Sequence, residues 1–594
     1  MANTSQSSLI NRSQLNFVGR DQHNIAHNTT NIINNLNVFN ITSETTLAGL
    51  RPVDRSGYYV PPCMRGTRQW IIDRIHTWLD DPETPNVLWL SGSPGAGKST
   101  IASTLVSQLM EMGRLGSSFF FKRADVALSN PAAVWRTVAF DLAQTDTVIA
   151  EKLTDNLNAR KIDPMRADIE SHFKYLIEEP LMECWRRRKE SSPEDRSNTG
   201  IDEEGPNEHK TEGIRNAPVP HRPVVVVVVL DALDECGFDN AQSTQRRIFM
   251  DTILKWSHLP SSFKLLTTSR DHLIPLSFRQ VSLRIPIETG DLTSHESNID
   301  IQNFLEQHFA KIACMSPSLQ SWPGPSIIKQ LTDRAAGLFI WAETVVRFLK
   351  QGFPETQLDL ILNAFREGGD IIDQLYLQIL QLSFPNSQVL YTLRRVVGAI
   401  VLAKTPLHRA DLGHFLGSQE RESSIDFILE NLSSVISTRN SDNRIYISHL
   451  SFAEFMCDRR RCHESFVIDL TTQNQIMTLA CLHIMKAGLR FNICNLESSY
   501  LRNDDLDLAP RIKRFISTHL LYACCFWAEH LSTTEFNLEL RDVVQEFMEV
   551  RLLYWLEVLS LVKRYNIASR ALLLIGEWIR VSESSLFGTS NLKL

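Results

Sequence analysis

The stretch NVLWLSGSPGAGKSTI, residues 86–101, constrains the fold of this chain more than any other. It fits the spacing G-x-x-x-x-G-K-[ST] from Gly92 to Ser99. The apolar run 87–90 before it has the composition of a buried strand, and residues 100–110 after it have the pattern of an amphipathic helix. An ordinary glycine-rich turn is the alternative. It would require a chance match, which for 25 glycines in 594 residues is on the order of one in a hundred.

A strand–loop–helix of this kind is typical of phosphate binding. Its glycines let the loop turn without Cβ clashes, so that backbone N–H groups can converge on phosphate oxygens at the positive end of the next helix. Lys98 would neutralise the β- and γ-phosphates, and the Ser99 hydroxyl would ligate Mg²⁺. The predicted nucleotide-binding residues are Gly92, Ser93, Pro94, Gly95, Ala96, Gly97, Lys98, Ser99 and Thr100.

A second strand with an acidic end is predicted at Pro223–Leu230, where six consecutive valines occur. The run is too short to cross a bilayer but suits a central parallel strand covered on both faces. Asp231 follows it and is placed to hold the Mg²⁺ shell, while Asp234 and Glu235 are placed to orient or deprotonate an attacking water. We therefore expect the loop and Asp231 to face one metal–triphosphate pair from two neighbouring strands. A solvated acidic turn is the alternative.

Together the two motifs resemble those of NACHT proteins, the NLR-like branch of the signal-transducing (STAND) P-loop ATPases, and the fungal members in particular. Their acidic strand reads D, a small residue, any residue, then D-E. Weaker likeness extends over roughly residues 60–535, in CMRGTR at Cys63–Arg68, FFFKR at Phe119–Arg123, AAGLFIWAETVVRFL at Ala335–Leu349 and YACCFWAEHL at Tyr522–Leu531. The resemblance implies a slow ATP-dependent switch, closed with ADP and opened by ATP, which self-associates in innate immunity or self/non-self recognition.

The resemblance also implies roles for residues outside the two motifs. Arg270 ends the apolar stretch FKLLTTSR, where this class senses the γ-phosphate, and a guanidinium there would lose its partner on hydrolysis. His449 matches a histidine that holds the β-phosphate of ADP in the closed state. Residues 66–68, Gly337 and Phe339 would lie near the adenine or the phosphates. A strand-end salt bridge for Arg270 and a purely structural histidine are the alternatives.

The order of these patterns predicts an α/β chain in which a P-loop NTPase parallel-sheet core precedes helical lid, winged-helix and helical C-terminal domains. With 594 residues the chain is long enough for about four domains. The predicted boundaries are 1–50 for an Asn-rich disordered segment, 51–284 for the core with a mobile insertion at 187–222, 285–385 for the lid, 386–465 for the winged helix and 466–594 for the C-terminal domain. No sensor repeat of fixed period is found, so we expect either a truncated relative or sensing through partners.

Two hypotheses fit the asparagine-rich residues 1–50. Their composition cannot build a core, which favours a disordered tail. Asparagine interleaved with β-branched residues can also stack as cross-β ladders, which would make the segment a short homotypic signalling motif.

Composition argues against several other classes. A net charge of -7 and a pI near 6.2 give no electrostatic argument for nucleic-acid binding. No membrane span is expected, because no window holds eighteen uninterrupted apolar residues. No signal peptide is expected either, because the stretch MANTSQSSLINRSQ lacks an apolar h-region. The ten cysteines lack paired C-x-x-C spacing, and Cys457, Cys462 and His463 lack a fourth zinc ligand. We expect a cytoplasmic protein with reduced thiols that uses ATP/ADP and Mg²⁺.

Two other functions remain open at this stage. A P-loop small-molecule kinase would need an acceptor pocket, which no segment marks. A scaffold that binds ATP or GTP without turnover would have no need of Asp234 and Glu235. For a switch, the expected partners are further copies of the chain on activation, an upstream ligand and a downstream effector, and the sequence marks neither of the last two.

Overall fold

The computed structural model describes residues 45–55, 60–123, 125–190, 225–237, 243–271, 275–314, 322–363, 370–417, 421–438, 443–498 and 508–588. The chain divides into two compact units, Met1–Pro52 with Trp135–Asp202, and Val53–Val134 with Glu203–Leu594. The hypotheses for residues 1–44 and for the insertion at 191–222 lie outside the described residues. Residues 187–190 form the last turn of helix α8, Glu179–Glu190.

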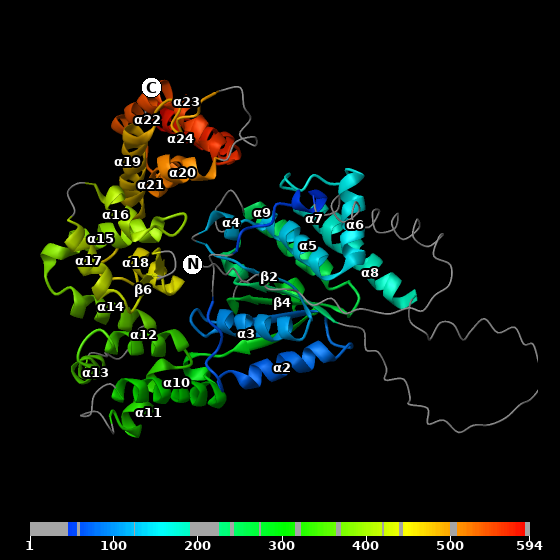
Figure 1. Cartoon of the computed structure of the whole chain (residues 1–594). Coiled ribbons are helices and arrows are strands. Elements are labelled where there is room, and N and C mark those ends of the chain that lie inside the picture. The colour runs from blue at the N-terminus through cyan, green and yellow to red at the C-terminus, as the bar shows by residue number, and fades with distance from the viewer. Residues whose placement is uncertain are drawn as a thin grey trace, which may run out of the picture. The chain divides into compact units, whose positions relative to one another are not determined.

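The larger unit is built on a five-stranded parallel sheet in the order β2-β3-β4-β1-β5 (Figure 1). Its strands are β1 Val87–Gly92, β2 Leu115–Phe120, β3 Val226–Asp231, β4 Phe263–Ser269 and β5 Ser282–Ile287. Parallel pairing brings the carboxyl ends of all five strands to one edge, where ligands bind in open α/β sheets. The predicted parallel-sheet core is confirmed.

Strand β4 lies between β1 and β3, so the expectation that the two motif strands are neighbours is wrong. Thr268 of β4 pairs in register with Leu90 of β1, and Thr267 pairs with Leu230 of β3. The end of β4 therefore stands between the glycine loop and Asp231. The hydroxyl and guanidinium side chains at the end of β4 can therefore reach toward the glycine loop on one side and Asp231 on the other.

Strand β5 was not predicted from the sequence. Its segment SLRIPI is short, and Arg284 and Pro286 interrupt its apolar pattern. Because β5 is at the edge of the sheet, next to β1 alone, a proline without an N–H is tolerated there.

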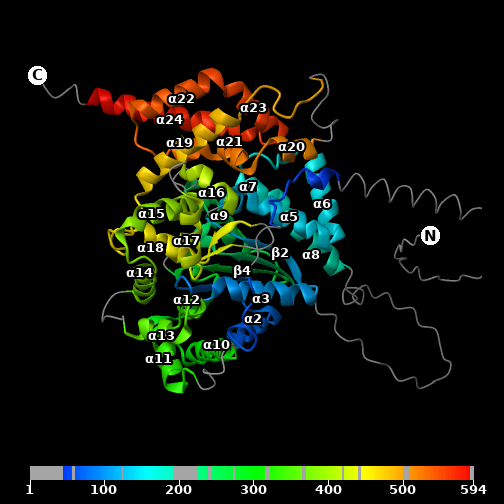
Figure 2. The same cartoon turned by 60° about the vertical axis from the view of Figure 1, so that its left-hand side comes forward.

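Helices cover both faces of the sheet. Helices α2, Gln69–Asp80, and α3, Lys98–Glu111, lie on one side of it, and α9, Ser243–Trp256, lies on the other (Figures 1 and 2). Alternate residues of each strand, such as Leu88 and Val227, belong to the core formed with α2 and α3. In β1, β3 and β4 their neighbours along the strand face the opposite way and are buried as well, which explains the uninterrupted valine run of β3.

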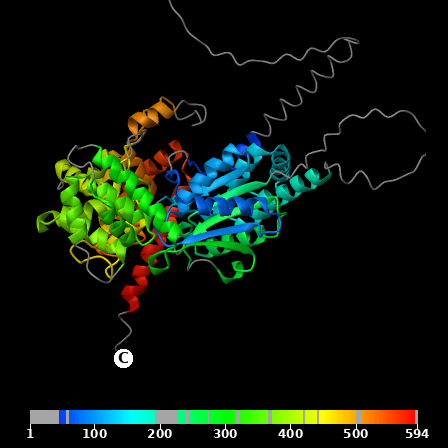
Figure 3. The same cartoon turned by 90° about the horizontal axis from the view of Figure 1, so that it is seen from below.

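The residues after β5 are mostly helical. The helices are α10 His295–Ala313, α11 Pro325–Ala335, α12 Phe339–Leu349, α13 Pro354–Asn363, α14 Ile371–Ser383, α15 Ser387–Leu402, α16 Arg409–Leu416, α17 Glu422–Asn431, α18 Leu450–Cys457, α19 Leu470–Gly488, α20 Ala509–Phe515, α21 Thr518–Leu531, α22 Leu538–Val550, α23 Leu552–Leu561 and α24 Asn566–Gly588, with an antiparallel pair β6 Ile436–Thr438 and β7 Ile445–Ile447. Buried side chains from α10 to α24 form one connected apolar cluster. In Figure 3 the green and yellow helices lie together in one group and the blue strand and helix elements in another.

The helical spacing at 326–350 is divided between two helices. Ala336 and Gly337 both have positive φ, at 45° and 82°, and they end α11 before α12 begins. None of the described helices combines the length and the apolar composition that a bilayer-spanning segment needs.

The smaller unit consists of helices α5 Val134–Thr145, α6 Thr147–Asn158, α7 Ile169–His172 and α8, with a π-helical turn at Phe173–Glu178. Asp146 caps α6 by accepting hydrogen bonds from the amides of Val148 and Ile149. Arg188 Nη2 of α8 lies 2.8 Å from Asp146 Oδ2. The basic end of α8 therefore pairs in part with the residue that caps α6.

Candidate functional site

The glycine loop joins β1 to α3 at the carboxyl edge of the sheet. Gly95 and Gly97 have φ of 83° and 95°, a region in which other residues are strained. Gly97 caps α3 without a side-chain hydrogen bond, so the first amides of α3 face the loop. A helix of 14 residues that begins in this way offers N–H groups and a positive dipole end to an anion.

Lys98 is folded back onto this loop. Its Nζ donates hydrogen bonds to the carbonyl oxygens of Gly92 and Ser93, at 2.8 and 2.9 Å. Burial lowers the pKa of Lys98, and the nearby carboxylates of Asp234 and Asp231 oppose that shift. The lysine is thus a desolvated cation whose present partners are only neutral carbonyl groups and more distant acids.

Asp231 is buried at the end of β3, with a relative exposure of 1%. Its Oδ1 accepts a hydrogen bond from Thr268 Oγ1 at 2.6 Å, and its carboxylate also accepts one from Ser99. Burial raises the pKa of Asp231 to about 6 despite these two hydrogen bonds. A serine hydroxyl and a carboxylate oxygen in direct contact are hard oxygen ligands of the kind Mg²⁺ takes, so these residues fit the metal that the sequence predicts.

Asp234 and Glu235 follow in a short 3-10 helix, Leu233–Glu235. Glu235 Oε2 accepts a hydrogen bond from the backbone N–H of Arg123, at 2.8 Å. Burial raises the pKa of Glu235 to about 7, with Asp234 adding to the shift. A carboxyl group with a pKa near neutrality can accept a proton from water and return it, as a general base must.

Arg270, at the end of β4, contacts two carboxylates. Its Nε lies 3.0 Å from Asp234 Oδ2 and its Nη2 lies 2.7 Å from Oε1 of Glu454 on α18. Glu454 was not among the predicted site residues. The helix that carries it begins directly after His449.

His449 lies beside the glycine loop. A Cβ placed on Gly95 would be 3.9 Å from His449 Cε1. The ring Nδ1 accepts a hydrogen bond from the backbone N–H of Ser451 at 3.1 Å and so caps α18. Burial lowers the pKa of His449 to about 4, and the positive charges of Lys98 and Arg270 lower it further. The ring is therefore neutral at pH 7, and since Nδ1 is an acceptor, Nε2 carries the proton.

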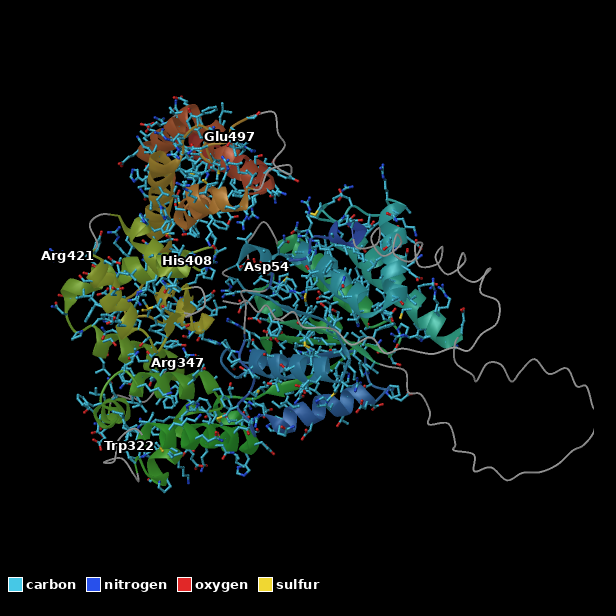
Figure 4. The ribbon with its side chains drawn as sticks, in the orientation of Figure 1. Asp54, Trp322, Arg347, His408, Arg421 and Glu497 are labelled. Carbon is cyan, nitrogen blue, oxygen red and sulfur yellow. The ribbon has the colours of Figure 1, made fainter. Side chains whose placement is uncertain are left out.

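A second set of contacts joins the loop to the helices that follow β5. The backbone N–H of Ile340, at the start of α12, donates to the carbonyl oxygen of Gly95 at 3.1 Å. Arg347, labelled on α12 in Figure 4, donates from Nη1 to Ser448 Oγ at 2.7 Å. Helix α12 thus touches both the loop and the residue before His449.

Arg68 connects the same loop to helix α10. Its Nη2 donates to the carbonyl oxygen of Ala96 at 2.8 Å, and its Nη1 donates to Ser297 Oγ at 2.6 Å. The guanidinium carbon lies 4.8 Å from the ring centre of Phe339. Thr67, also predicted near the nucleotide, uses its hydroxyl in a 2.8 Å hydrogen bond to the carbonyl oxygen of Met64.

The structure thus brings together residues from four separate parts of the sequence at one edge of the sheet. These residues are Lys98, Ser99, Asp231, Asp234, Glu235, Arg270 and His449. Sequence reasoning missed Thr268 and Glu454. The stretch FKLLTTSR, with its terminal hydroxyls, signals the first, and the phrase HLSFAEF contains the second.

Comparisons with known proteins agree with this geometry. Residues 66–193 match the family model described as Nephrocystin 3, N-terminal. Vegetative incompatibility protein HET-E-1 of Podospora anserina is 21% identical over an alignment of 529 residues, which covers 83% of this chain and 35% of that protein. The chain has the fold of a P-loop NTPase, with a parallel sheet and a glycine loop that leads into α3. It spans about a third of the length of the curated relative that it matches.

Two solved structures with partial similarity to this chain have low similarity scores. A signal transduction ATPase with numerous domains (STAND) and a tetratricopeptide repeat sensor, from Pyrococcus horikoshii, has a TM-score of 0.36 and 10% identity over 88% of this chain and 66% of that chain. A Drosophila ORC structure bound to DNA has a TM-score of 0.28 and 10% identity over 70% of this chain and 91% of that chain. The assignment to the P-loop class rests instead on the strand order and the motif geometry.

Proposed function

We propose that this chain is an NLR-like, NACHT-type switch that binds ATP with Mg²⁺, hydrolyses it slowly, is closed with ADP and opens with ATP. In this proposal the amides of the loop and Lys98 bind the phosphates. Ser99 and Asp231 hold the metal, whose charge would stabilise the transferring phosphoryl group. Asp234 and Glu235 position and deprotonate water.

The roles proposed for Arg270 and His449 concern the state of the nucleotide. Arg270 would face the third phosphate, and His449 would donate from Nε2 to the β-phosphate of ADP. The neutral ring with its proton on Nε2, which follows from the contact of Nδ1 with Ser451, supports the second role.

One observation carries the proposal. The loop expected to bind phosphate is also contacted by helices far along the chain, through Ile340 of α12 and His449 before α18. A ligand that changes the loop or its surroundings must therefore change the free energy of these contacts. Moving a switch from nearly all closed to nearly all open requires about 5.5 kcal/mol of differential binding, so we expect an upstream signal or partner to contribute.

The test measures three properties of the full chain: the nucleotide that copurifies with it, its affinity for ADP, ATP and GTP by calorimetry, and its rate of ATP hydrolysis. We expect tight ADP binding, hydrolysis that is abolished in Glu235→Gln, and faster ADP release in His449→Ala. Particle mass measured with each nucleotide tests the proposed self-association.

Three outcomes would change the proposal. Absence of binding to any purine nucleotide would refute it. Binding with unchanged, negligible turnover in wild type and Glu235→Gln would favour the scaffold, and transfer of phosphate to a small molecule would favour the kinase. A cytoplasmic location and a role in innate immunity or self/non-self recognition belong to the same proposal, and localisation of the full chain in its own cells tests the first.

A further inference from the structure

Glu454 joins the helix that follows His449 to two arginines of the sheet core. Its Oε1 lies 2.7 Å from Arg270 Nη2 and 3.3 Å from Arg123 Nη1. The three side chains are 18 to 22% exposed, so the pairs are partly shielded from water. Pairs of this kind are stronger than the exposed ion pairs elsewhere on the surface.

Each arginine also contacts one of the two acids that follow β3. Arg270 Nε lies 3.0 Å from Asp234 Oδ2, and the backbone N–H of Arg123 donates to Glu235 Oε2 at 2.8 Å. A single carboxylate on α18 is thus linked to both acids, to Asp234 through the guanidinium of Arg270 and to Glu235 through the backbone N–H of Arg123. The partners lie 184 and 331 residues away from Glu454 in the sequence.

A purely structural ion pair is the simpler explanation, and two observations argue against it. Burial alone would lower the pKa of Arg270, yet its pKa is raised, with the hydrogen bond and charge of Glu454 as the largest opposing causes. The guanidinium is therefore held by two carboxylates, Glu454 at 2.7 Å and Asp234 at 3.0 Å. In addition, α18 begins at the residue that approaches the glycine loop, so Glu454 and His449 must move together.

We propose that Glu454 is a positioning residue that occupies the guanidinium of Arg270 with a carboxylate until the γ-phosphate of ATP competes for it. The inference rests on the proposed function, since it requires that the loop bind ATP and ADP. A guanidinium exchanges one bound anion for another without a change in its own charge. ADP has no third phosphate and does not compete, so Glu454 lowers the affinity for ATP relative to ADP.

The test compares affinities for ADP and for a non-hydrolysable ATP analogue, both with Mg²⁺, by calorimetry on the full chain. In Glu454→Gln, which keeps the size of the side chain and removes its charge, we expect the ratio of ATP to ADP affinity to rise about tenfold, as for loss of one charge-assisted hydrogen bond. In Glu454→Asp, which keeps the charge and shortens the reach, we expect a rise of about threefold. The second variant decides the question if the first does not fold.

Asp373→Asn is the matched control. Asp373 of α14 pairs with Arg461, just after α18, at 2.6 Å, so the variant removes an equivalent ion pair near the same helix without touching Arg270. We expect no change in its affinity ratio. In Arg270→Gln the addition of Glu454→Gln should have no further effect, because the two residues act through one contact.

The outcomes separate this inference from the proposed function. An unchanged ratio in both Glu454 variants, or an equal rise in Asp373→Asn, would overturn the inference while leaving nucleotide binding intact. Wild-type protein that binds neither nucleotide would overturn both.

Discussion

At the scale of single residues, burial shifts the charged groups around the glycine loop toward their neutral forms. It raises the pKa of Asp231 to about 6 and that of Glu235 to about 7, and it lowers the pKa of Lys98 and that of His449, the latter to about 4. Each shift is a free-energy cost of keeping that group charged in the folded protein. A metal ion and a polyphosphate would supply the opposite charges these groups lack, which is how ligand binding would stabilise the fold.

Glu235 should make the ligand-free protein less stable as the pH rises. Its pKa when folded, about 7, exceeds the usual value of 4.5, so the folded state binds the proton more tightly and loses stability between pH 4.5 and pH 7. Glu235→Gln removes the titration. We expect this variant to be more stable than wild type by roughly 1–3 kcal/mol at pH 8, with the difference vanishing near pH 4.5. Thermal melts across this range measure the effect, and Glu549→Gln on exposed α22 is the control.

Lys98→Ala should remove most of the affinity for nucleotide without unfolding the protein. The variant loses a desolvated cation whose only hydrogen bonds in the ligand-free state go to two loop carbonyls. We expect ADP and ATP to bind about 100-fold or more weakly, as when one partner of a buried charge pair is truncated. Calorimetry gives the affinities, and Lys311→Ala on the surface of α10 should bind like wild type. If Lys98→Ala binds nucleotide as tightly as wild type, Lys98 does not contribute to the binding site.

At the scale of elements, the conformation of the loop between β1 and α3 depends both on its own glycines and on the elements that pack against it. A Cβ on Gly95 would lie 2.0 Å from Ile340 Cγ2, so helix α12 packs where a side chain would otherwise be. The residue must be glycine for two reasons, the positive φ and this contact.

Gly95→Ala should therefore loosen α12. The methyl group collides with Ile340, and we expect a cost of about 1–3 kcal/mol, as for overpacking elsewhere. Hydrogen exchange of the Ile340 amide, which donates to the Gly95 carbonyl, measures the loss and should become faster. Ile340→Ala in the same chain should restore part of the protection, while the strain of the positive φ remains. If Ile340→Ala restores no protection, the collision between the new methyl group and Ile340 is not what loosens α12.

Elements with strong local patterns could be predicted from the sequence. Elements and contacts that depend on pairing between distant segments could not. Strands β1, β3 and β4 and the residues at their ends follow from apolar runs that stop at glycine, acid or hydroxyl residues. The position of β4 between β1 and β3, and the existence of β5, follow from pairing that no local pattern encodes. The same holds for Glu454, whose partners are more than 180 residues away.

At the scale of the whole larger unit, apolar side chains pack in separate clusters, and polar contacts link the parts that contain them. One connected apolar cluster runs from α10 to α24, and a separate one lies between the sheet and helices α2 and α3. Hydrogen bonds and ion pairs at Arg68, Glu454 and Ile340 link the site to the later helices. Because the two apolar clusters are separate, we expect the larger unit to open along the boundary between them.

Acid should favour that opening through His449. Its pKa in the folded state, about 4, lies below the usual value of 6.5, so stability is present above pH 6.5 and is lost as the pH falls toward 4. Protonation places a charge beside Lys98 and Arg270, with Asp234 as the nearest opposing carboxylate. The expected loss is roughly 2 kcal/mol at pH 5.

Hydrogen exchange of α18, corrected for intrinsic rates, tests this between pH 7 and pH 5. His449→Asn keeps a residue suited to capping α18 and removes the titration. We expect protection of α18 to decrease in wild type and to stay constant in the variant. Identical profiles would show that His449 does not set the acid response.

Strand β4 also makes folding of the sheet and assembly of the site a single event. Thr268 donates to Asp231 and accepts from the Ala232 amide, Ser269 accepts from Trp89, and Arg270 pairs with Asp234. Because neighbouring residues of a strand point to opposite faces, slippage of β4 by one position would break all of these contacts together. A mispaired sheet would lack the proposed nucleotide site, so nucleotide binding by the purified chain would also report that β4 is correctly paired.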